Sequence, residues 1–277
     1  MSQAYQANQA QIDYWNGRAG EKWAAMQARL DQMLANVTKV LNARAGAVSG
    51  QRVLDIGCGT GETCTIWLAG GAEVTGLDVS APMLAVAKER TGGKATLVKA
   101  DASVWRSETP FDLAVSRFGV MFFEAPDPAF ANIVTNLRPG GRLLFACWRS
   151  LPENQWASLP IASIRDLLPE APPPVPHAPG PFALADKDRL GGILERAGFT
   201  DVTISPVDFT VCLSSGGLED AVSFTLQMGP AGAALAEASN ELKAEAAERL
   251  KAALAPYQRE GQVTLDAAIW LVEAFTS

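Results

Sequence analysis

The residues best placed to do chemistry stand where short apolar segments end. The stretch VLDIGCGTG, residues 53–61, runs from an apolar segment into three glycines at alternate positions, Gly57, Gly59 and Gly61. A glycine turn after the first strand of an α/β sheet lets a nucleotide-like ligand approach the backbone closely. Asp55 stands just before this turn, and Asp78 ends the next apolar segment. The spacing of these groups decides which ligand the turn suits.

Two ligand classes fit this spacing poorly. A phosphate-binding Walker loop requires GxxxxGK[ST], which the sequence lacks. A dinucleotide site requires GxGxxG with the pyrophosphate at a helix N-terminus, whereas the spacing here is GxGxG. A carboxylate at Asp55 would repel a pyrophosphate but suits a ligand with an amino group. Asp78 lies where a carboxylate accepts hydrogen bonds from both ribose hydroxyls.

These residues need a sheet to bring them together, and the pattern of residues 50–148 predicts one. Strands are predicted at 52–56, 73–79, 95–100, 111–116 and 142–148, and helices at 61–70, 80–90 and 127–137. This alternation predicts a parallel sheet with right-handed crossovers and helices on both faces. Ser80 is the predicted N-cap of the second helix, with Pro82 in its first turn.

The flanking regions add further elements. Residues 8–45 have apolar residues at helical spacing, and Gly17 and Gly20 are expected to divide them into two helices. Later segments predict helices at 152–168, 187–199 and 241–257, a strand or bent strand pair at 202–213, and a last strand at about 268–275. The proline-rich residues 169–182 predict either a linker or a rigid loop over a site.

The same stretches resemble the motifs of class I S-adenosylmethionine-dependent methyltransferases. The resemblance lies in VLDIGCGTG, GLDVSAPML (76–84), KADAS (99–103), FDLAVSRFGVMFF (111–123) and LRPGGRLLF (137–145), in the expected order and spacing. The leading segment QIDYWNGRAGEKW (11–23) resembles the aromatic-rich helices of a bacterial subgroup related to the ubiquinone and menaquinone methyltransferases. A nucleoside with a ribose, an ammonium group and no phosphate is S-adenosylmethionine, which agrees with the glycine spacing.

The resemblance implies a Rossmann-like α/β fold. Its sheet is expected to have seven mostly parallel strands with helices on both faces, and a helical insertion is expected before the last strand. Residues 1–49 are expected to form a helical lid, and 50–277 a methyltransferase domain with cap elements at about 150–182 and 214–262.

The resemblance also implies a set of cofactor contacts. The glycines let the loop pass the methionine moiety, Asp55 lies near its amino group, Asp78 binds the ribose, and Asp101 accepts from the adenine amino group. The full predicted set is Tyr14, Trp15, Asp55, Gly57, Gly59, Gly61, Asp78, Val79, Met83, Asp101, Ala102, Ser116 and Arg117.

Several of these residues have simpler interpretations, which the sequence leaves open. Met83 can be core alone, and Asp101 can cap a turn. Tyr14 and Trp15 can stack near the sulfonium, because an aromatic face attracts a cation. Alternatively, they can serve only to anchor the first helix. His177 and Tyr14 are the candidate catalytic residues. His177 is the only histidine in the sequence, and it can be either a general base or an ordinary surface residue. Cys58 is expected to be a small filler of the loop.

Composition narrows the class of partner. The chain has 277 residues, 48% of them hydrophobic, and 23 Lys plus Arg against 30 Asp plus Glu give a net charge of −7. A nucleic acid or an anionic membrane surface requires a concentrated basic face, so neither is expected as a partner. The sequence predicts no signal peptide, no membrane span and no zinc site. Free thiols, a cytoplasmic location and a monomer or homodimer are expected.

The predicted function is methyl transfer from S-adenosylmethionine to a small-molecule acceptor, with S-adenosylhomocysteine as product. The residues SRFGV, which follow the fourth predicted strand, lack the [ND]PP[YF] pattern of amide and nucleobase N-methyltransferases. Two alternatives are an NAD(P)-dependent oxidoreductase, against which the glycine spacing and Asp55 argue, and a non-catalytic module that binds S-adenosylmethionine.

Overall fold

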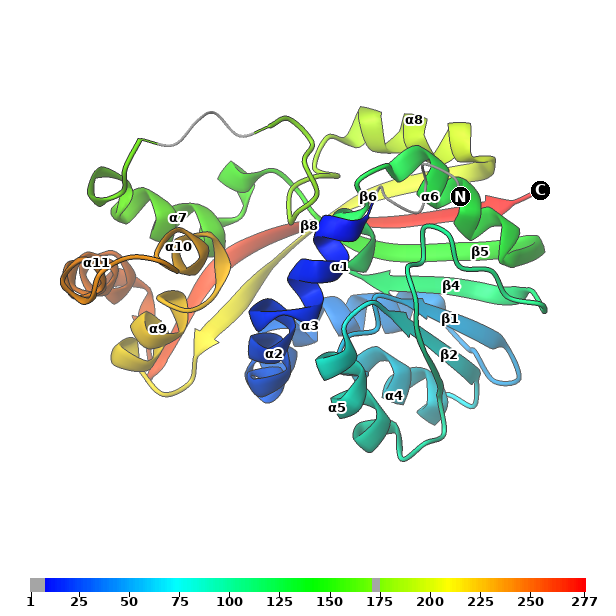
Figure 1. Cartoon of the computed structure of the whole chain (residues 1–277), viewed down its shortest axis with the longest axis horizontal. Coiled ribbons are helices and arrows are strands. Elements are labelled where there is room, and N and C mark those ends of the chain that lie inside the picture. The colour runs from blue at the N-terminus through cyan, green and yellow to red at the C-terminus, as the bar shows by residue number, and fades with distance from the viewer. Residues whose placement is uncertain (1–7, 171–174) are drawn as a thin grey trace. The chain divides into compact units, whose positions relative to one another are not determined.

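The computed structural model describes residues 8–170 and 175–277, which divide into two compact units (Figure 1). The first unit comprises 8–148, Pro176–Pro206 and Ile269–Ser277, and the second comprises the described residues between Arg149 and Val175 together with Val207–Ala268. Every residue of the predicted cofactor site lies in the first unit. No helix in these described ranges is long and apolar enough to cross a membrane.

The central sheet confirms the predicted α/β class. Its strand order is β3-β2-β1-β4-β5-β8-β6, and the two-residue strand β7 also pairs with β8. The parallel strands are β1 (Arg52–Ile56), β2 (Glu73–Asp78), β3 (Thr96–Lys99), β4 (Phe111–Arg117) and β5 (Leu137–Trp148). β8 (Gln262–Thr276) is antiparallel to β5, and the last strands are β6 (Phe199–Ser214) and β7 (Gln258–Arg259). The final strand is therefore confirmed but is longer than predicted.

The crossover helices follow the sequence signals closely. They are α4 (Glu62–Ala69), α5 (Ala81–Thr91) and α6 (Pro126–Thr135), and α8 (Lys187–Ala197) precedes β6. The Ser80 hydroxyl accepts from the Met83 amide, so Ser80 is the N-cap of α5 as predicted. Because each parallel strand feeds its helix at the same edge, the carboxyl ends of β1, β2, β3 and β4 all meet there.

The N-terminal region forms three helices, so the prediction of two helices was wrong. They are α1 (Gln9–Asn16), α2 (Arg18–Ala25) and α3 (Gln27–Ala45). Gly17 makes the first break as predicted, but Gly20 lies inside α2 and makes none. Met26 makes the second break, where the backbone leaves helical geometry at φ −97° and ψ 12°. The apolar spacing continues through Met26, which is why the pattern did not indicate this break.

The second unit is mainly helical. It contains α7 (Gln155–Ser163), α9 (Leu218–Thr225), α10 (Gly229–Ala234) and α11 (Asn240–Leu254). The predicted helix at 152–168 is instead α7 between two short 3₁₀ turns, Leu151–Glu153 and Arg165–Leu167. Asn154 separates the first turn from α7, because its side-chain amide donates to the carbonyls of Arg149 and Ser150 and so holds the chain in a non-helical conformation.

Candidate functional site

The glycine loop between β1 and α4 packs tightly against its neighbours. Gly57 has φ +67°, and a Cβ there would lie 2.7 Å from the Gly119 Cα. Gly61 has φ +80°, and a Cβ there would lie 2.9 Å from the Ala87 Cβ. Gly59 is also left-handed, with φ +54°. A side chain at Gly57 or Gly61 would therefore both strain the backbone and clash, so the loop requires glycine for its shape.

Asp55, at the base of this loop, is an incompletely partnered buried carboxylate. Its side chain is 1% exposed, and its Oδ2 accepts from the Cys64 thiol at 3.4 Å. Its Oδ1 has no hydrogen-bond partner among the described residues. Burial raises the pKa of Asp55 to about 6, against the opposing effects of the nearby Thr63 side chain, the Cys64 hydrogen bond and the Arg117 charge. A cationic donor on Oδ1 would satisfy this group and restore its charge.

Asp78 ends β2 and ties the glycine loop to the start of α5. Its Oδ2 accepts from the Gly59 amide and its Oδ1 from the Ser80 amide, both at 2.8 Å. Burial raises the pKa of Asp78, and these two amides act in the opposite direction. A carboxylate has about four lone-pair sites, so both oxygens can still accept from ribose hydroxyls. The side chain thus has the capacity that the predicted role requires.

Asp101 follows β3 at the same edge of the sheet. Its Oδ1 accepts from the Ser103 amide at 2.9 Å and from the Asn8 side chain at 3.1 Å. Its Oδ2 has no hydrogen-bond partner in the described part of the chain. The Ala102 carbonyl accepts from Asn132 at 3.0 Å, which fixes the backbone beside Asp101. Asp101 thus caps its own turn through Oδ1, and its Oδ2 is left to accept from a ligand. The turn-capping and the adenine-binding interpretations of Asp101 are therefore compatible.

Met83 and Val79 lie between these carboxylates. Met83 is buried, and its Sδ would lie 3.8 Å from a Cβ at Gly59, which places the thioether beside the glycine loop. The Val79 carbonyl accepts from the Asn16 side chain at 2.7 Å. The structure therefore brings both residues to the predicted adenosine end of the site.

Ser116 and Arg117, at the end of β4, are engaged within the protein. The Ser116 hydroxyl donates to the Ile56 carbonyl at 2.8 Å and accepts from the Gly119 amide at 3.1 Å, which ties β4 to β1. Arg117 donates to Thr38 at 2.8 Å and forms an ion pair with Glu62. Both side chains thus fix residues that flank the glycine loop: Ser116 fixes Ile56 before it, and Arg117 fixes Glu62 after it.

Sequence reasoning missed a charged network behind the glycine loop. Asp31 of α3 pairs with Arg90 at 2.8 Å and lies 3.7 Å from Arg117. Arg90 donates to the Thr60 carbonyl at 3.2 Å, and Arg117 pairs with Glu62, so the two arginines hold the residues on either side of Gly61. Burial raises the pKa of Glu62. No spacing in the sequence indicates such partners, because they lie on three separate helices and a strand.

Aromatic side chains gather after β4. Phe118 has φ +69°, a left-handed conformation that a bulky residue rarely adopts, and its ring stacks on Trp148 at 4.2 Å. Trp15 makes edge-to-face contacts with Tyr14, Trp23 and Phe122 at 5.2, 5.8 and 5.1 Å. Trp15 thus anchors α1 to the segment after β4, which does not test its predicted contact with the sulfonium.

The two candidate catalytic residues lie on the surface. The Tyr14 side chain is 56% exposed, and His177 is exposed with φ +59°. Part of the proline-rich loop, residues 171–174, lies outside the described residues. The end of this loop is attached near β4, because the Gly180 amide donates to the Met121 carbonyl at 3.1 Å. No described hydrogen bond links Tyr14 or His177 to the glycine loop.

The thiols of the loop are held in their neutral form. A hydrogen bond with Cys64, together with burial, raises the pKa of Cys58 well above its usual value. A Cβ atom at Gly76, in β2, would lie 2.9 Å from the Cys58 Sγ and 3.0 Å from the Cys64 Sγ. Both thiols therefore pack directly against the backbone of β2 at Gly76. Cys58 is therefore poorly suited to nucleophilic attack, which requires a thiolate. Among the described residues, no group of His, Cys, Asp or Glu side chains is placed to hold a metal ion.

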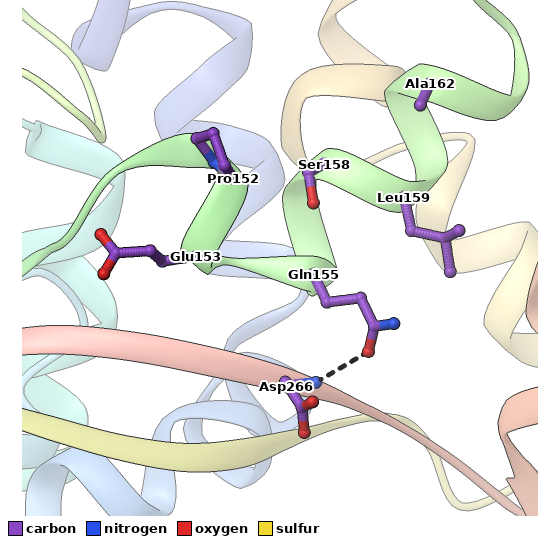
Figure 2. Close-up of a pocket in the computed structure, with 7 residues that line it drawn as sticks. All are labelled: Pro152, Glu153, Gln155, Ser158, Leu159, Ala162 and Asp266. Carbon is purple, nitrogen blue, oxygen red and sulfur yellow. Dashed lines mark hydrogen bonds between the residues drawn. The ribbon is translucent and has the colours of Figure 1, made fainter.

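A separate pocket lies within the second unit (Figure 2). It has a volume of about 470 Å³ and is lined by Pro152, Glu153, Gln155, Ser158, Leu159, Ala162 and Asp266. The Gln155 side-chain oxygen accepts from the Asp266 amide at 3.2 Å across its floor. None of the predicted site residues lines this pocket, so its size alone does not make it the functional site.

Comparison with known proteins identifies the family. A family model described as a methyltransferase domain matches residues 54–145. The chain is 31% identical over 170 residues to the ubiquinone biosynthesis O-methyltransferase of Aromatoleum aromaticum, covering 59% of this chain and 72% of that protein. It is 33% identical over 150 residues to the malonyl-[acyl-carrier protein] O-methyltransferase of Salmonella typhimurium, covering 53% of this chain and 58% of that protein. The chain spans about half the length of the malonyl-[acyl-carrier protein] O-methyltransferases it matches.

Solved structures agree in fold. Phosphoethanolamine N-methyltransferase 2 of Haemonchus contortus, in complex with S-adenosyl-L-methionine, superposes with a TM-score of 0.58 at 19% identity, covering 96% of this chain and 59% of that one. Magnesium protoporphyrin IX methyltransferase of Synechocystis PCC 6803, with bound S-adenosylhomocysteine, gives 0.55 at 15% identity, covering 98% and 100%. Together with the sequence relatives and the ordered carboxylates at the sheet edge, this shows that the chain belongs to the S-adenosylmethionine-dependent methyltransferases.

Proposed function

We propose that this chain transfers a methyl group from S-adenosylmethionine to a small-molecule acceptor, leaving S-adenosylhomocysteine. The observation that carries the proposal is the Oδ1 atom of Asp55, which is buried and has no partner among the described residues. An unpaired buried carboxylate oxygen is costly, so it indicates a missing cationic partner. The ammonium group of the cofactor's methionine end is such a partner, and a pyrophosphate is not.

The proposed binding mode uses one carboxylate at each of three strand ends. Asp55, near the end of β1, holds the ammonium group; Asp78, the last residue of β2, the ribose hydroxyls; and Asp101, after β3, the adenine amino group. These strands are neighbours in the order β3-β2-β1, so the three side chains follow one another along the sheet edge. An extended nucleoside lying across this edge would meet them in sequence.

The chemical step requires alignment more than acid–base machinery. The cofactor would supply a sulfonium, and an acceptor atom would attack its methyl carbon in line while the CH3–S bond breaks and neutral S-adenosylhomocysteine leaves. The protein orients the two reactants and excludes water, and both effects are established sources of rate. The aromatic residues after β4 contribute an apolar cover. Tyr14 and His177 remain the candidates for removing a proton from the acceptor.

The proposed acceptor is small and partly apolar. Two observations support it: the rings of Phe118 and Trp148 at the ends of β4 and β5, and relatives named for demethylmenaquinone and ubiquinone biosynthesis. We further propose a monomer or homodimer in the cytoplasm, where free thiols such as the four of this chain are kept reduced. No nucleic-acid partner is proposed, because the net charge is −7.

Thermal unfolding with added ligands tests the proposal. We expect S-adenosylmethionine and S-adenosylhomocysteine to raise the melting temperature, and NAD(P) to leave it unchanged, because a ligand stabilises the native state that binds it. At a ligand concentration of about 100 times Kd, the stabilisation is about 2.7 kcal/mol. Stabilisation by NAD(P) alone would favour the oxidoreductase alternative. With labelled methyl donor and a metabolite extract, S-adenosylhomocysteine should accumulate, whereas binding without any turnover would favour a non-catalytic module.

A further inference from the structure

We propose that Asn8 is a positioning residue that makes the adenine end of the site selective for an amino group, and that Asn16 docks its helix for this purpose. The inference rests on the proposed function, since it concerns the base of the same cofactor. It assigns roles to the two asparagines at the ends of α1: Asn8 lies outside the resembling segments, and Asn16 lies in the segment 11–23 without a role assigned to it. Both side chains contact backbone or carboxylate groups of the cofactor loops.

Asn8 bridges the loops that follow β3 and β4. Its side-chain amide nitrogen donates to the Asp101 Oδ1 at 3.1 Å, and its side-chain oxygen accepts from the Glu124 amide at 3.0 Å. The residue is only 7% exposed. Because both ends of the amide are engaged, its orientation is determined, with the donor directed at the carboxylate.

The second contact holds Asp101 in one rotamer. The Ser103 amide donates to the same Oδ1 at 2.9 Å, so this oxygen has two donors while Oδ2 has none among the described residues. A carboxylate fixed in this way presents one acceptor in one direction. The exocyclic amino group of adenine matches that acceptor.

Asn16 docks the other end of α1 onto the turn between β2 and α5. Its side chain donates to the Val79 carbonyl at 2.7 Å and accepts from the Ala81 amide at 3.2 Å. The next helix comes equally close, because a Cβ at Gly20 would lie 2.5 Å from the Ser80 Oγ. These contacts hold α1 over the turn that carries Asp78, and so hold Asn8 at Asp101.

The consequence concerns the choice between adenine and hypoxanthine. Hypoxanthine has a carbonyl oxygen in place of the amino group, and a protonated N1 beside it. A fixed carboxylate would face that carbonyl oxygen and repel it. Without Asn8, Asp101 keeps the Ser103 amide but loses its second described donor on Oδ1. The carboxylate can then turn to accept from the N1–H instead, so loss of Asn8 should relax the selectivity as well as weaken binding.

Calorimetric titration with S-adenosylhomocysteine and S-inosylhomocysteine tests this role. The 277-residue chain should prefer the adenosyl ligand at least about 100-fold, since a site built for one hydrogen-bonding group rejects its replacement strongly. Asn8→Ala should weaken adenosyl binding about fivefold to tenfold, as expected for one hydrogen bond, and should reduce the preference to about tenfold or less. Asn16→Ala should act in the same direction.

Gln9→Ala is the matched control, because Gln9 lies on the same helix, is exposed, and makes its described side-chain hydrogen bond to the exposed Asp13. It should leave the affinities and their ratio unchanged. A wild-type chain that binds both ligands equally, or an Asn8→Ala variant with an unchanged ratio, would overturn the role of Asn8. A wild-type chain that binds neither ligand would instead contradict the proposed function. If Asn8→Ala does not fold, Asn16→Ala decides the matter, because an unchanged ratio in that variant would equally overturn the role of the α1 asparagines.

Discussion

Asp78→Ala is expected to remove measurable binding of S-adenosylmethionine while the chain stays folded. The substitution deletes the acceptor for two ribose hydroxyls, and hydrogen bonds to a charged group contribute about 1.5–3 kcal/mol each. Two such bonds correspond to a loss of affinity of about 10²- to 10⁴-fold. Calorimetric titration measures this loss, and circular dichroism reports the fold.

The fold should survive because two effects of the substitution oppose each other. The Gly59 and Ser80 amides lose their acceptor, but a buried carboxylate with a raised pKa is removed as well. Asp112→Ala is a suitable control, since Asp112 also lies in the sheet but pairs with Arg138 and accepts from the Arg52 amide. The Asp112→Ala variant should bind S-adenosylmethionine with the affinity of the wild type. Retained affinity in Asp78→Ala would show that the ribose assignment is wrong.

Asp55→Asn is expected to weaken cofactor binding about tenfold to a hundredfold near neutral pH and to abolish its pH dependence. The ligand's ammonium group needs the ionised carboxylate, and burial raises the pKa of Asp55 to about 6. In the wild type, affinity should therefore fall as pH drops through 6, by up to tenfold per pH unit. The asparagine amide carries no charge to lose, so its affinity should be flat across this range. Titrations between about pH 5 and pH 8 measure both slopes.

Asp55 should affect the stability of the ligand-free chain in the opposite sense from ligand affinity: stability should fall as pH rises, whereas affinity should increase. Because the pKa of folded Asp55 is raised above the ordinary value of 3.8, its contribution to stability is fully present below that value and is lost as pH rises through 6. Asp55→Asn should therefore gain stability relative to the wild type between about pH 4 and pH 8, as urea unfolding can measure. A wild-type affinity that does not vary through pH 6 would contradict the ammonium contact.

The sequence predicted the strands that carry the proposed cofactor contacts for a physical reason. Strand ends, glycines and acidic residues are local signals, and a parallel sheet brings successive strand ends to one edge. The placement of Asp55 and Asp78 at this edge therefore followed from local signals, whereas Asp101 was assigned from the family resemblance. The cap at Ser80 and the break at Gly17 are equally local and were also correctly predicted.

What the sequence could not predict depends on contacts between distant elements. Asp31, Glu62, Arg90 and Arg117 meet from three helices and a strand, and no spacing rule records this. The roles of Asn8 and Asn16 depend on where α1 packs. The left-handed backbone of Phe118 could not be predicted either, because phenylalanine rarely adopts a positive φ. That turn is accompanied by contacts between distant residues, namely the stacking of Phe118 on Trp148 and the close approach of Gly119 to Gly57.

A crystal structure of the chain with S-adenosylhomocysteine tests the central claim most directly. We predict the ligand's ammonium nitrogen within about 3 Å of the Asp55 Oδ1, the ribose hydroxyls on Asp78, and the adenine amino group on the Asp101 Oδ2. Asn8 should remain bonded to the other oxygen of Asp101. A ligand bound elsewhere, or bound with its ammonium group away from Asp55, would contradict the proposed site.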